Sequence, residues 1–326
     1  MLRQTGNRVL TTLLQPPGFR PVLWPEEKTF AFTVIDDTDQ ATLPAVQPIY
    51  ELLHQLGLHT TKTVWVEPTV EPEENDSCGD TLADEPYRDF ILRLQDRGFE
   101  IAFHGARGGS SKRLETKAAL EQFQRILGHD PKVHVNHFQN RENLYGGRHK
   151  LDFRPLRWLY SLFLRWNFEG HNPQSPYFWG DLAKRHITYV RDFHFDEIDV
   201  MQIYPLLPFH DPRRPYVNFW FHASDGSNID SFVRLLSREN LNRLEHNHGL
   251  CIVYTHFGKG FCTDGEVGGA VADRLRDVAG RDGWFAPVGE ILDYLRRQNG
   301  DQTISYKNRV YMELRWALEK LGRGTT

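Results

Sequence analysis

The chain has 326 residues, 40% of them hydrophobic and 25% charged, and a formal net charge of −4. This is the composition of a globular protein with a large core. The overall charge gives no support for a nucleic-acid partner or an anionic membrane, although local basic patches stay open. The three cysteines, Cys78, Cys251 and Cys262, lack CxxC spacing, which argues against a disulfide framework and fits a reducing compartment.

The sequence shows no secretion signal and no membrane helix. The first 21 residues hold no apolar stretch long enough for a signal peptide. No segment approaches the ~18–20 apolar residues that a membrane span requires. We therefore expect a soluble, cytoplasmic protein without membrane insertion.

Short strands alternate with amphipathic helices along the chain. Runs rich in Val, Ile, Phe and Tyr predict strands at 30–35, 62–66, 99–103, 133–136, 187–190, 217–221, 251–255 and 284–288. Apolar residues spaced three and four apart predict helices at 45–56, 87–95, 114–127, 232–244, 270–278, 288–295 and 305–321. The alternation is typical of a parallel sheet covered by helices, and about eight such units favour a barrel over an open sheet.

The predicted fold is therefore α/β, a distorted (β/α) barrel of seven to eight parallel strands in a single domain. We expect the barrel over residues 26–300, preceded by an N-terminal segment at 1–25 and followed by a C-terminal helix and tail at 301–326. An acidic, proline-bearing loop is expected at 68–84. Packing on the barrel exterior and a dimer contact are both open for the last helix, so a homo-oligomer stays open.

Adjacent carboxylates follow the first strand, at the end where β/α barrels carry their active sites. Asp36 and Asp37 repel each other unless a positive charge, such as a divalent metal ion, lies beside them. The structural alternative is helix capping by Asp39 or Thr42. Capping needs one such residue and not three acids.

Two histidines stand directly after apolar strands and before glycines. His104 opens a glycine-rich turn after the third strand, and His256 ends the late strand at 251–255. Each alone is typical of a hydrogen-bonded structural histidine. The turn after His104 lacks the GxxxxGK[ST] spacing of a phosphate-binding loop, so a nucleotide site is not expected there. Lys259, close to His256, suits either a substrate carboxylate or phosphate or a solvated salt bridge.

The segment after the fourth strand is dense in polar side chains. It carries Asn136, His137, Asn140 and Arg141, whose donors and acceptors suit the recognition of sugar hydroxyls. The alternative is a loop satisfied by its own backbone, since Asn is a common turn residue.

Three further residues are candidates for the substrate pocket. Trp179 and Asp181 end a segment rich in prolines and aromatic residues, and an aromatic ring there suits stacking on a sugar face. Arg191 stands at the end of a predicted strand, where it can pair with Asp36 or bind an acidic group. Aromatic packing within the loop and surface ion pairs are the alternatives.

Three segments together resemble the polysaccharide deacetylase family. Residues 32–38 (FTVIDDT) resemble its TFDDG segment, and residues 98–104 (GFEIAFH) resemble its second motif, which typically reads GHEIGxH. Residues 251–256 (CIVYTH) are similar to its late strand that ends in histidine. The segments occur in the order that the family shows.

The resemblance implies roles for four residues. Asp36 would be the general base, Asp37 and His104 would be metal ligands, and His256 would be the general acid that protonates the leaving amine. It also implies a divalent metal ion, for which zinc suits imidazole-rich ligation.

The chain departs from the family pattern at two points. Gly108 stands where the family usually has a further histidine ligand, and the RxPxG segment is absent. We hypothesise that His137, one strand along, supplies the missing ligand.

The function implied by the resemblance is metal-dependent hydrolysis of an N-acyl group, most simply acetyl, on a carbohydrate. Because no export signal is visible, we expect a nucleotide-linked or lipid-linked sugar of surface polysaccharide or lipopolysaccharide biosynthesis. Two alternatives stay open: a non-catalytic carbohydrate-binding protein on a decayed barrel, and a metal-free amidohydrolase. A DxD glycosyltransferase motif at 37–39 is not favoured by the barrel alternation.

Overall fold

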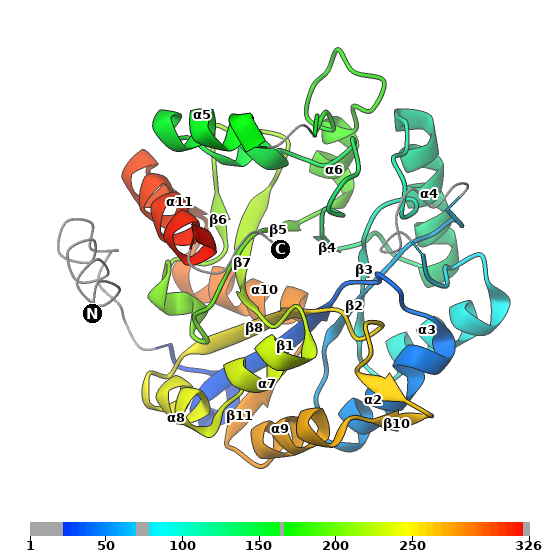
Figure 1. The fold of residues 1–326 in the computed structure, drawn as a ribbon, viewed down its shortest axis with the longest axis vertical. Coiled ribbons are helices and arrows are strands. Elements are labelled where there is room, and N and C mark those ends of the chain that lie inside the picture. Colours follow the sequence, from blue (N-terminus) through cyan, green and yellow to red (C-terminus); the bar gives the residue numbers. More distant parts are fainter. Residues whose placement is uncertain (1–21, 70–77, 164–165, 322–326) are drawn as a thin grey trace.

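A computed structural model describes residues 22–69, 78–163 and 166–321, and its parallel strands close into a barrel. The ring runs β1, β2, β3, β4, β5, β7, β8 and back to β1 (Figure 1). The bounds are β1 Phe30–Asp36, β2 Thr61–Val64, β3 Glu100–Phe103, β4 Val133–His134, β5 Tyr189–Phe195, β7 Phe219–Asp225 and β8 Leu250–Thr255. The predicted α/β barrel of seven to eight parallel strands is therefore confirmed.

Short strands extend this sheet beyond the ring. β11 (Gly283–Phe285) pairs with the first half of β1, and β2 pairs with its second half, so two strands share one edge of β1. β6 (Phe209–His210) pairs with β7 and with β12 (Gln302–Thr303). β9 (Cys262–Thr263) and β10 (Glu266–Val267) form a separate hairpin. Each strand expected from the sequence is present, the last as β11, whereas β6, β9, β10 and β12 were not predicted.

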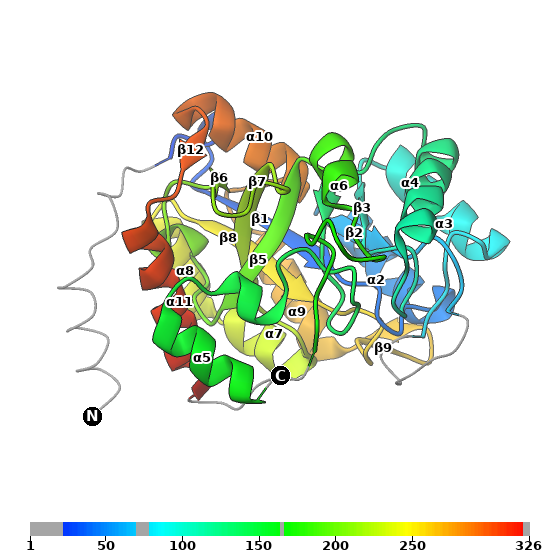
Figure 2. The ribbon, with the colours of Figure 1, turned by 90° about the horizontal axis from the view of Figure 1, so that it is seen from above.

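Helices surround the ring (Figures 1 and 2). They are α2 Leu43–Gln55, α3 Glu85–Asp96, α4 Arg113–Leu127, α5 Arg154–Phe163, α6 Gly180–His186, α7 Ile229–Leu235, α8 Arg238–His246, α9 Gly269–Ala279, α10 Val288–Asn299 and α11 Tyr306–Leu321, with single turns η1 Pro25–Glu27, η3 Gly147–Lys150 and η4 Val200–Gln202.

The helix predictions differ from the structure in three places. The helix expected at 232–244 is two helices, because the Ser237 side chain accepts a hydrogen bond from the Asn240 N–H and caps a new start. Helices α5 and α6 were not predicted. Most of the N-terminal segment at 1–25 and half of the loop at 68–84 lie outside the described residues.

The ring strands are buried on both faces. Every residue of β1 and of β2 is buried, as a sheet enclosed by helices requires. Among the described residues, no helix combines the length and the apolar character needed to cross a bilayer.

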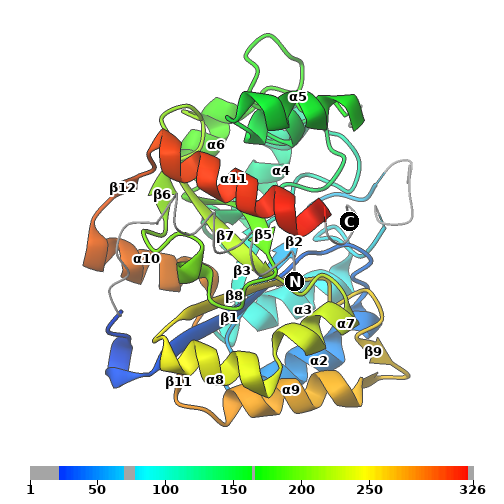
Figure 3. The same ribbon diagram turned by 60° about the vertical axis from the view of Figure 1, so that its left-hand side comes forward.

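The C-terminal helix α11 packs along β5 through buried charges (Figure 3). Arg309 is fully buried and forms ion pairs with Asp192 on β5 and with Glu313 on its own helix. Glu313 also accepts hydrogen bonds from the N–H groups of Asp152 and Phe153, directly before α5. The helix therefore packs on the barrel exterior, one of its two expected roles, while the dimer contact stays a prediction.

Candidate metal and catalytic site

The loops after four strands bring one acid and three histidines together. Asp39 lies in the loop after β1, His104 directly after β3, His137 in the loop after β4, and His256 directly after β8. All four side chains are buried. Because the strands are parallel, their carboxyl ends meet at one end of the barrel, where barrel enzymes carry their active sites.

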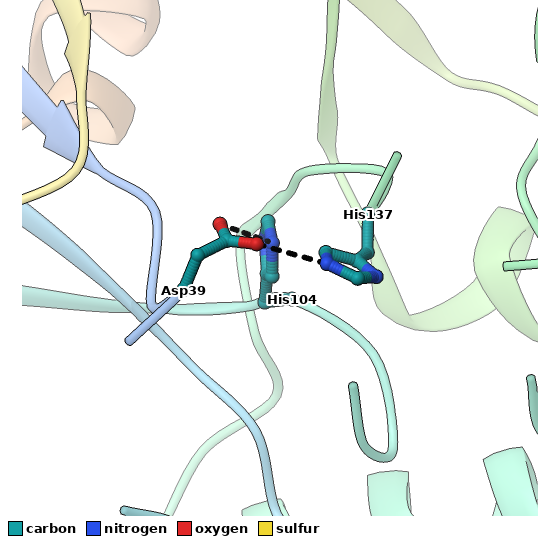
Figure 4. A group of neighbouring side chains, drawn as sticks. All are labelled: Asp39, His104 and His137. Atoms are coloured by element: carbon teal, nitrogen blue, oxygen red, sulfur yellow. Dashed lines mark hydrogen bonds and ion pairs between the residues drawn. The ribbon is translucent and has the colours of Figure 1, made fainter. Parts of the chain in front are cut away.

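The Asp39 carboxylate is the point on which the three imidazoles converge. Nε2 of His137 lies 2.8 Å from Asp39 Oδ1, and Nε2 of His256 and of His104 lie 3.3 and 3.6 Å from Oδ2. Figure 4 shows the Asp39 carboxylate facing the rings of His104 and His137, with a dashed line to each. Burial opposes ionisation, but the facing histidines hold the pKa of Asp39 well below its ordinary value. The carboxylate is therefore ionised.

Hydrogen bonds to Nδ1 fix the tautomers of His137 and His256, and therefore the state of the Nε2 atom that faces Asp39. Nδ1 of His137 lies 3.1 Å from Oδ1 of Asn140, and Nδ1 of His256 lies 3.0 Å from the carbonyl oxygen of Ser227. Both partners are acceptors, so each Nδ1–H must donate, and Nε2 of the neutral ring carries a lone pair. A lone pair that faces a carboxylate requires a proton or a metal cation between them.

His104 gives an independent indication of a cation site. Its ring is buried, and neither nitrogen has a hydrogen-bond partner among the described residues. The 3.6 Å separation from Asp39 is too long for a hydrogen bond. A buried polar group without a partner is costly and calls for a ligand.

The donor atoms fit a divalent metal ion. Those of Asp39, His104 and His137 lie within 4.8 Å of one another, as do those of Asp37, Asp39 and His256. Two donors around one tetrahedral ion are spaced by about 3.4 Å. His104 and His256 lie at about that separation from Asp39, whereas His137, at 2.8 Å, lies at hydrogen-bond distance. A carboxylate with imidazoles suits zinc and other first-row divalent ions.

Asp37 lies beside this cluster and is held by Arg191 on β5. Its two oxygens accept hydrogen bonds of 2.8 and 2.7 Å from the two terminal nitrogens of the guanidinium. The guanidinium also stacks 4.1 Å from the ring centroid of Tyr254. Burial alone would raise the pKa of Asp37, but Arg191 and, more weakly, His104 bring it below the ordinary value. Asp37 is therefore ionised and fixed in orientation, with Arg191 bound to it and not to Asp36.

Asp36, expected as the general base, is engaged by core residues. Its Oδ2 lies 3.0 Å from Lys62 Nζ and accepts a 3.0 Å hydrogen bond from the Tyr50 hydroxyl, while Oδ1 accepts one of 2.7 Å from the Phe257 N–H. Asp36 and Lys62 are both fully buried. Burial raises the pKa of Asp36, although Lys62 opposes the shift. With both oxygens engaged, Asp36 ties β1 to β2 and to the loop after β8.

Lys62→Met leaves the Asp36 carboxylate buried without a counter-charge. We expect this substitution to lower the free energy of unfolding by about 3–5 kcal/mol, since removing one partner of a buried ion pair strands the other. Urea denaturation followed by fluorescence measures the change. Adding Asp36→Asn should recover much of the lost free energy of unfolding, because the unpaired buried carboxylate is then removed. A Lys62→Met protein as stable as the wild type would show that the pair has no structural role.

Two of the residues predicted to bind substrate make side-chain hydrogen bonds to the backbone. Asn136 exchanges hydrogen bonds with the backbone of Leu144, which closes the loop after β4. Trp179 is buried, and its indole N–H donates to the carbonyl oxygen of Glu142.

The other predicted substrate residues lie at different depths. Asp181 forms a bidentate ion pair with Arg113 at the surface. Arg141 is exposed, stacks 4.3 Å over the Tyr177 ring and forms a 2.9 Å ion pair with Glu169. Lys259 is half-buried three residues after His256. A substrate role for these three residues stays a prediction.

Asn140 positions His137 and is itself positioned by Glu142. Its Nδ2 donates to the carbonyl oxygen of Arg107 and to Glu142 Oε1, each over 3.1 Å, so its Oδ1 faces His137. Glu142 is buried, and burial raises its pKa to about 7. In the sequence, Glu142 is marked only by the polar density of its loop.

Two glycines allow the site loops to take their course. Gly105, directly after His104, has a φ of +119°, which side-chain-bearing residues rarely adopt. A Cβ at Gly258 would lie 2.5 Å from the carbonyl carbon of Gln40. The loop after β8 therefore runs directly against the loop after β1 and brings His256 to Asp39.

Comparison with known proteins gives matches among solved structures alone. No family model matches the sequence, and no curated protein matches it. A crystal structure named as a polysaccharide deacetylase from Mycobacterium smegmatis is 14% identical, covers 89% of this chain and 99% of its own, and has a TM-score of 0.51. A structure of PuuE allantoinase is 11% identical and covers 86% of this chain and 94% of its own, also with a TM-score of 0.51. At these identities the likeness concerns the fold, and the chain has the fold of the polysaccharide deacetylases.

Proposed function

We propose that this protein is a metal-dependent hydrolase that removes an N-acyl group, most simply acetyl, from a carbohydrate. The observation that carries the proposal is the convergence of three imidazoles on the Asp39 carboxylate, in a barrel with the deacetylase fold. One acid and two or three imidazoles leave a metal ion open to water and substrate.

The requirements of amide hydrolysis suggest a role for each residue around the cluster. The reaction needs an activated water, stabilisation of charge on the carbonyl oxygen, and a proton for the leaving amine. A divalent ion held by Asp39, His104 and His137 would supply Lewis acidity and lower the pKa of water. Asp37, ionised and oriented by Arg191, accepts the proton of the attacking water. This moves the general-base role from Asp36 to its neighbour.

His256 donates the proton to the leaving amine. Its Nδ1–H is fixed on the carbonyl oxygen of Ser227, and its Nε2 lies 3.2 Å from the Tyr254 hydroxyl and faces the cluster. Burial disfavours a charged ring, but the Asp39 carboxylate raises the pKa of His256 above its ordinary value. The protonated form that a general acid requires is thereby favoured.

The substrate class in this proposal is a nucleotide-linked or lipid-linked N-acyl sugar of surface polysaccharide assembly. The loop after β4, which supplies His137, also carries exposed Arg141 stacked on Tyr177. A guanidinium beside an aromatic ring suits a sugar that bears a phosphate, since Arg binds phosphate in a bidentate manner. Zinc and a cytoplasmic location, expected from the sequence, belong to the same proposal.

Release of acid from N-acyl sugars tests the function. Purified protein is incubated with free, nucleotide-linked and lipid-linked N-acetyl sugars, and acetate and free amine are measured. We expect both products in equal amounts, loss of release with a chelator, and recovery on adding zinc. Acetate release that continues at the same rate with a chelator would instead support a metal-free amidohydrolase. Sugar binding without release would support a non-catalytic carbohydrate-binding protein.

A further inference from the structure

Helix α5, together with Trp166 after its end, presents large apolar side chains to solvent. Trp158, Leu159, Leu162 and Trp166, which we call the α5 ridge, are 67, 41, 59 and 43% exposed. Trp158 and Leu162 are four residues apart and therefore share one helix face. The exposed fractions are high for tryptophan and leucine, and grouped exposed apolar side chains mark an interaction surface.

The opposite face of α5 holds the helix on the protein. Leu156 and Tyr160 pack against the hydrophobic core, and the Tyr160 ring lies 5.8 Å from the Trp316 ring of α11. Figures 1 and 3 show α5 at the edge of the molecule beside α11. The α5 ridge is therefore the outward face of an anchored helix and not part of an incomplete core.

Basic side chains border the α5 ridge. Residues 148–157 contain Arg148, Arg154 and Arg157 against the single acid Asp152, in a chain whose net charge is −4, while the Lys150 ammonium points inward and donates to the carbonyl oxygen of Asp192. All three of these arginines are exposed. This is the local basic patch that the overall charge did not reveal. A helix with tryptophan and leucine on one side and basic residues at its border is typical of an interfacial membrane-binding helix.

The charge pattern favours a membrane over a second copy of this chain. A two-fold dimer through the α5 ridge would bring the arginine-rich borders of both copies into one interface, where like charges repel. An anionic bilayer surface instead attracts them, at about 1 kcal/mol for each basic residue near the surface. The tryptophans then lie at the level of the headgroups.

We propose that the α5 ridge docks on an anionic membrane surface. Trp158, Leu162 and their neighbours insert at the headgroup level, and the bordering arginines contact anionic headgroups. The connection between β4 and β5 carries both this surface and His137. The inference rests on the surface alone and stands whether or not the proposed hydrolysis is correct.

Binding of the full chain to vesicles tests this proposal. Wild-type protein is co-sedimented with phosphatidylcholine vesicles with and without phosphatidylglycerol, and tryptophan fluorescence is recorded. We expect binding to the anionic vesicles that weakens with salt. Trp158→Ser combined with Leu162→Ser should reduce that binding at least about tenfold, since burial of even one such side chain is worth that factor. Arg154→Gln should reduce it about fivefold.

Leu114→Ser is the matched control, because Leu114 on α4 is 78% exposed but lies away from α5 (Figure 1). Leu114→Ser should bind vesicles as the wild type does. This variant and the Trp158→Ser/Leu162→Ser double variant should both keep the wild-type activity on water-soluble substrates. Absence of wild-type binding, or equal binding by the double variant, would overturn the proposal. So would a wild-type dimer in light scattering that the double variant converts to a monomer without any vesicle binding, because a second copy would then cover the ridge.

Discussion

Asp39→Asn should remove the bound divalent ion and reduce hydrolysis by more than about 100-fold. Asp39 is the carboxylate that faces Nε2 of His104, His137 and His256. Loss of an outer hydrogen-bond partner of a metal ligand already costs 10–100-fold, so loss of the ligand itself should cost more. Elemental analysis of purified protein and acetate release measure the two effects.

Asp181→Asn is the control for this substitution, because Asp181 pairs with Arg113 at the surface. It removes the same charge and should leave metal content and activity at wild-type levels. An Asp39→Asn protein with a full complement of metal and normal turnover would contradict the assignment of Asp39.

His256→Gln should lower turnover by about 10²–10⁴-fold while the metal content stays at the wild-type level. That range is typical for loss of a positioned general acid. The pH profile of turnover should also lose the limb that reports deprotonation of the acid. Steady-state kinetics across pH, with elemental analysis of the same samples, measures both.

His186→Gln is the matched control, since His186 pairs with Asp130 outside the site. It should not change turnover. A fully active His256→Gln protein would refute the role of general acid. Loss of metal together with activity would show instead that His256 is a ligand, alongside Asp37 and Asp39.

The position of the site could be predicted because strand ends are visible in a sequence. Apolar runs located β1, β3, β4 and β8, and in a parallel barrel the residues after such runs meet at one end. His104, His137 and His256 were therefore expected together, although they come from loops far apart in the chain. The structure brings all three to one carboxylate.

The separate roles of Asp36, Asp37 and Asp39 could not be predicted. Successive residues at a strand end point to opposite sides. Which of the three acids faces the histidines therefore depends on the register of the strand and on the turn that follows it. Asp36 turns to Lys62 and Asp37 to Arg191, and these partners become neighbours only through packing. Asp39 was considered as a helix cap, but the N–H of Leu43 at the start of α2 donates to Asp80.

Helix α5 was missed for a different reason. Helices were predicted from apolar faces on the assumption that those faces are buried. In α5 the residues Trp158, Leu159 and Leu162 are exposed, while Leu156 and Tyr160 face the core. The polar residues Arg154, Arg157 and Ser161 share one face of α5, so its periodicity was present in the sequence and was overlooked.

A crystal structure grown with zinc, with anomalous scattering recorded at the zinc edge, tests the metal site most directly. The site proposed for Asp39, His104 and His137 predicts one dominant anomalous peak in contact with all three side chains. A map in which these side chains keep their arrangement at saturating zinc, but the ion is absent or bound elsewhere, would contradict it.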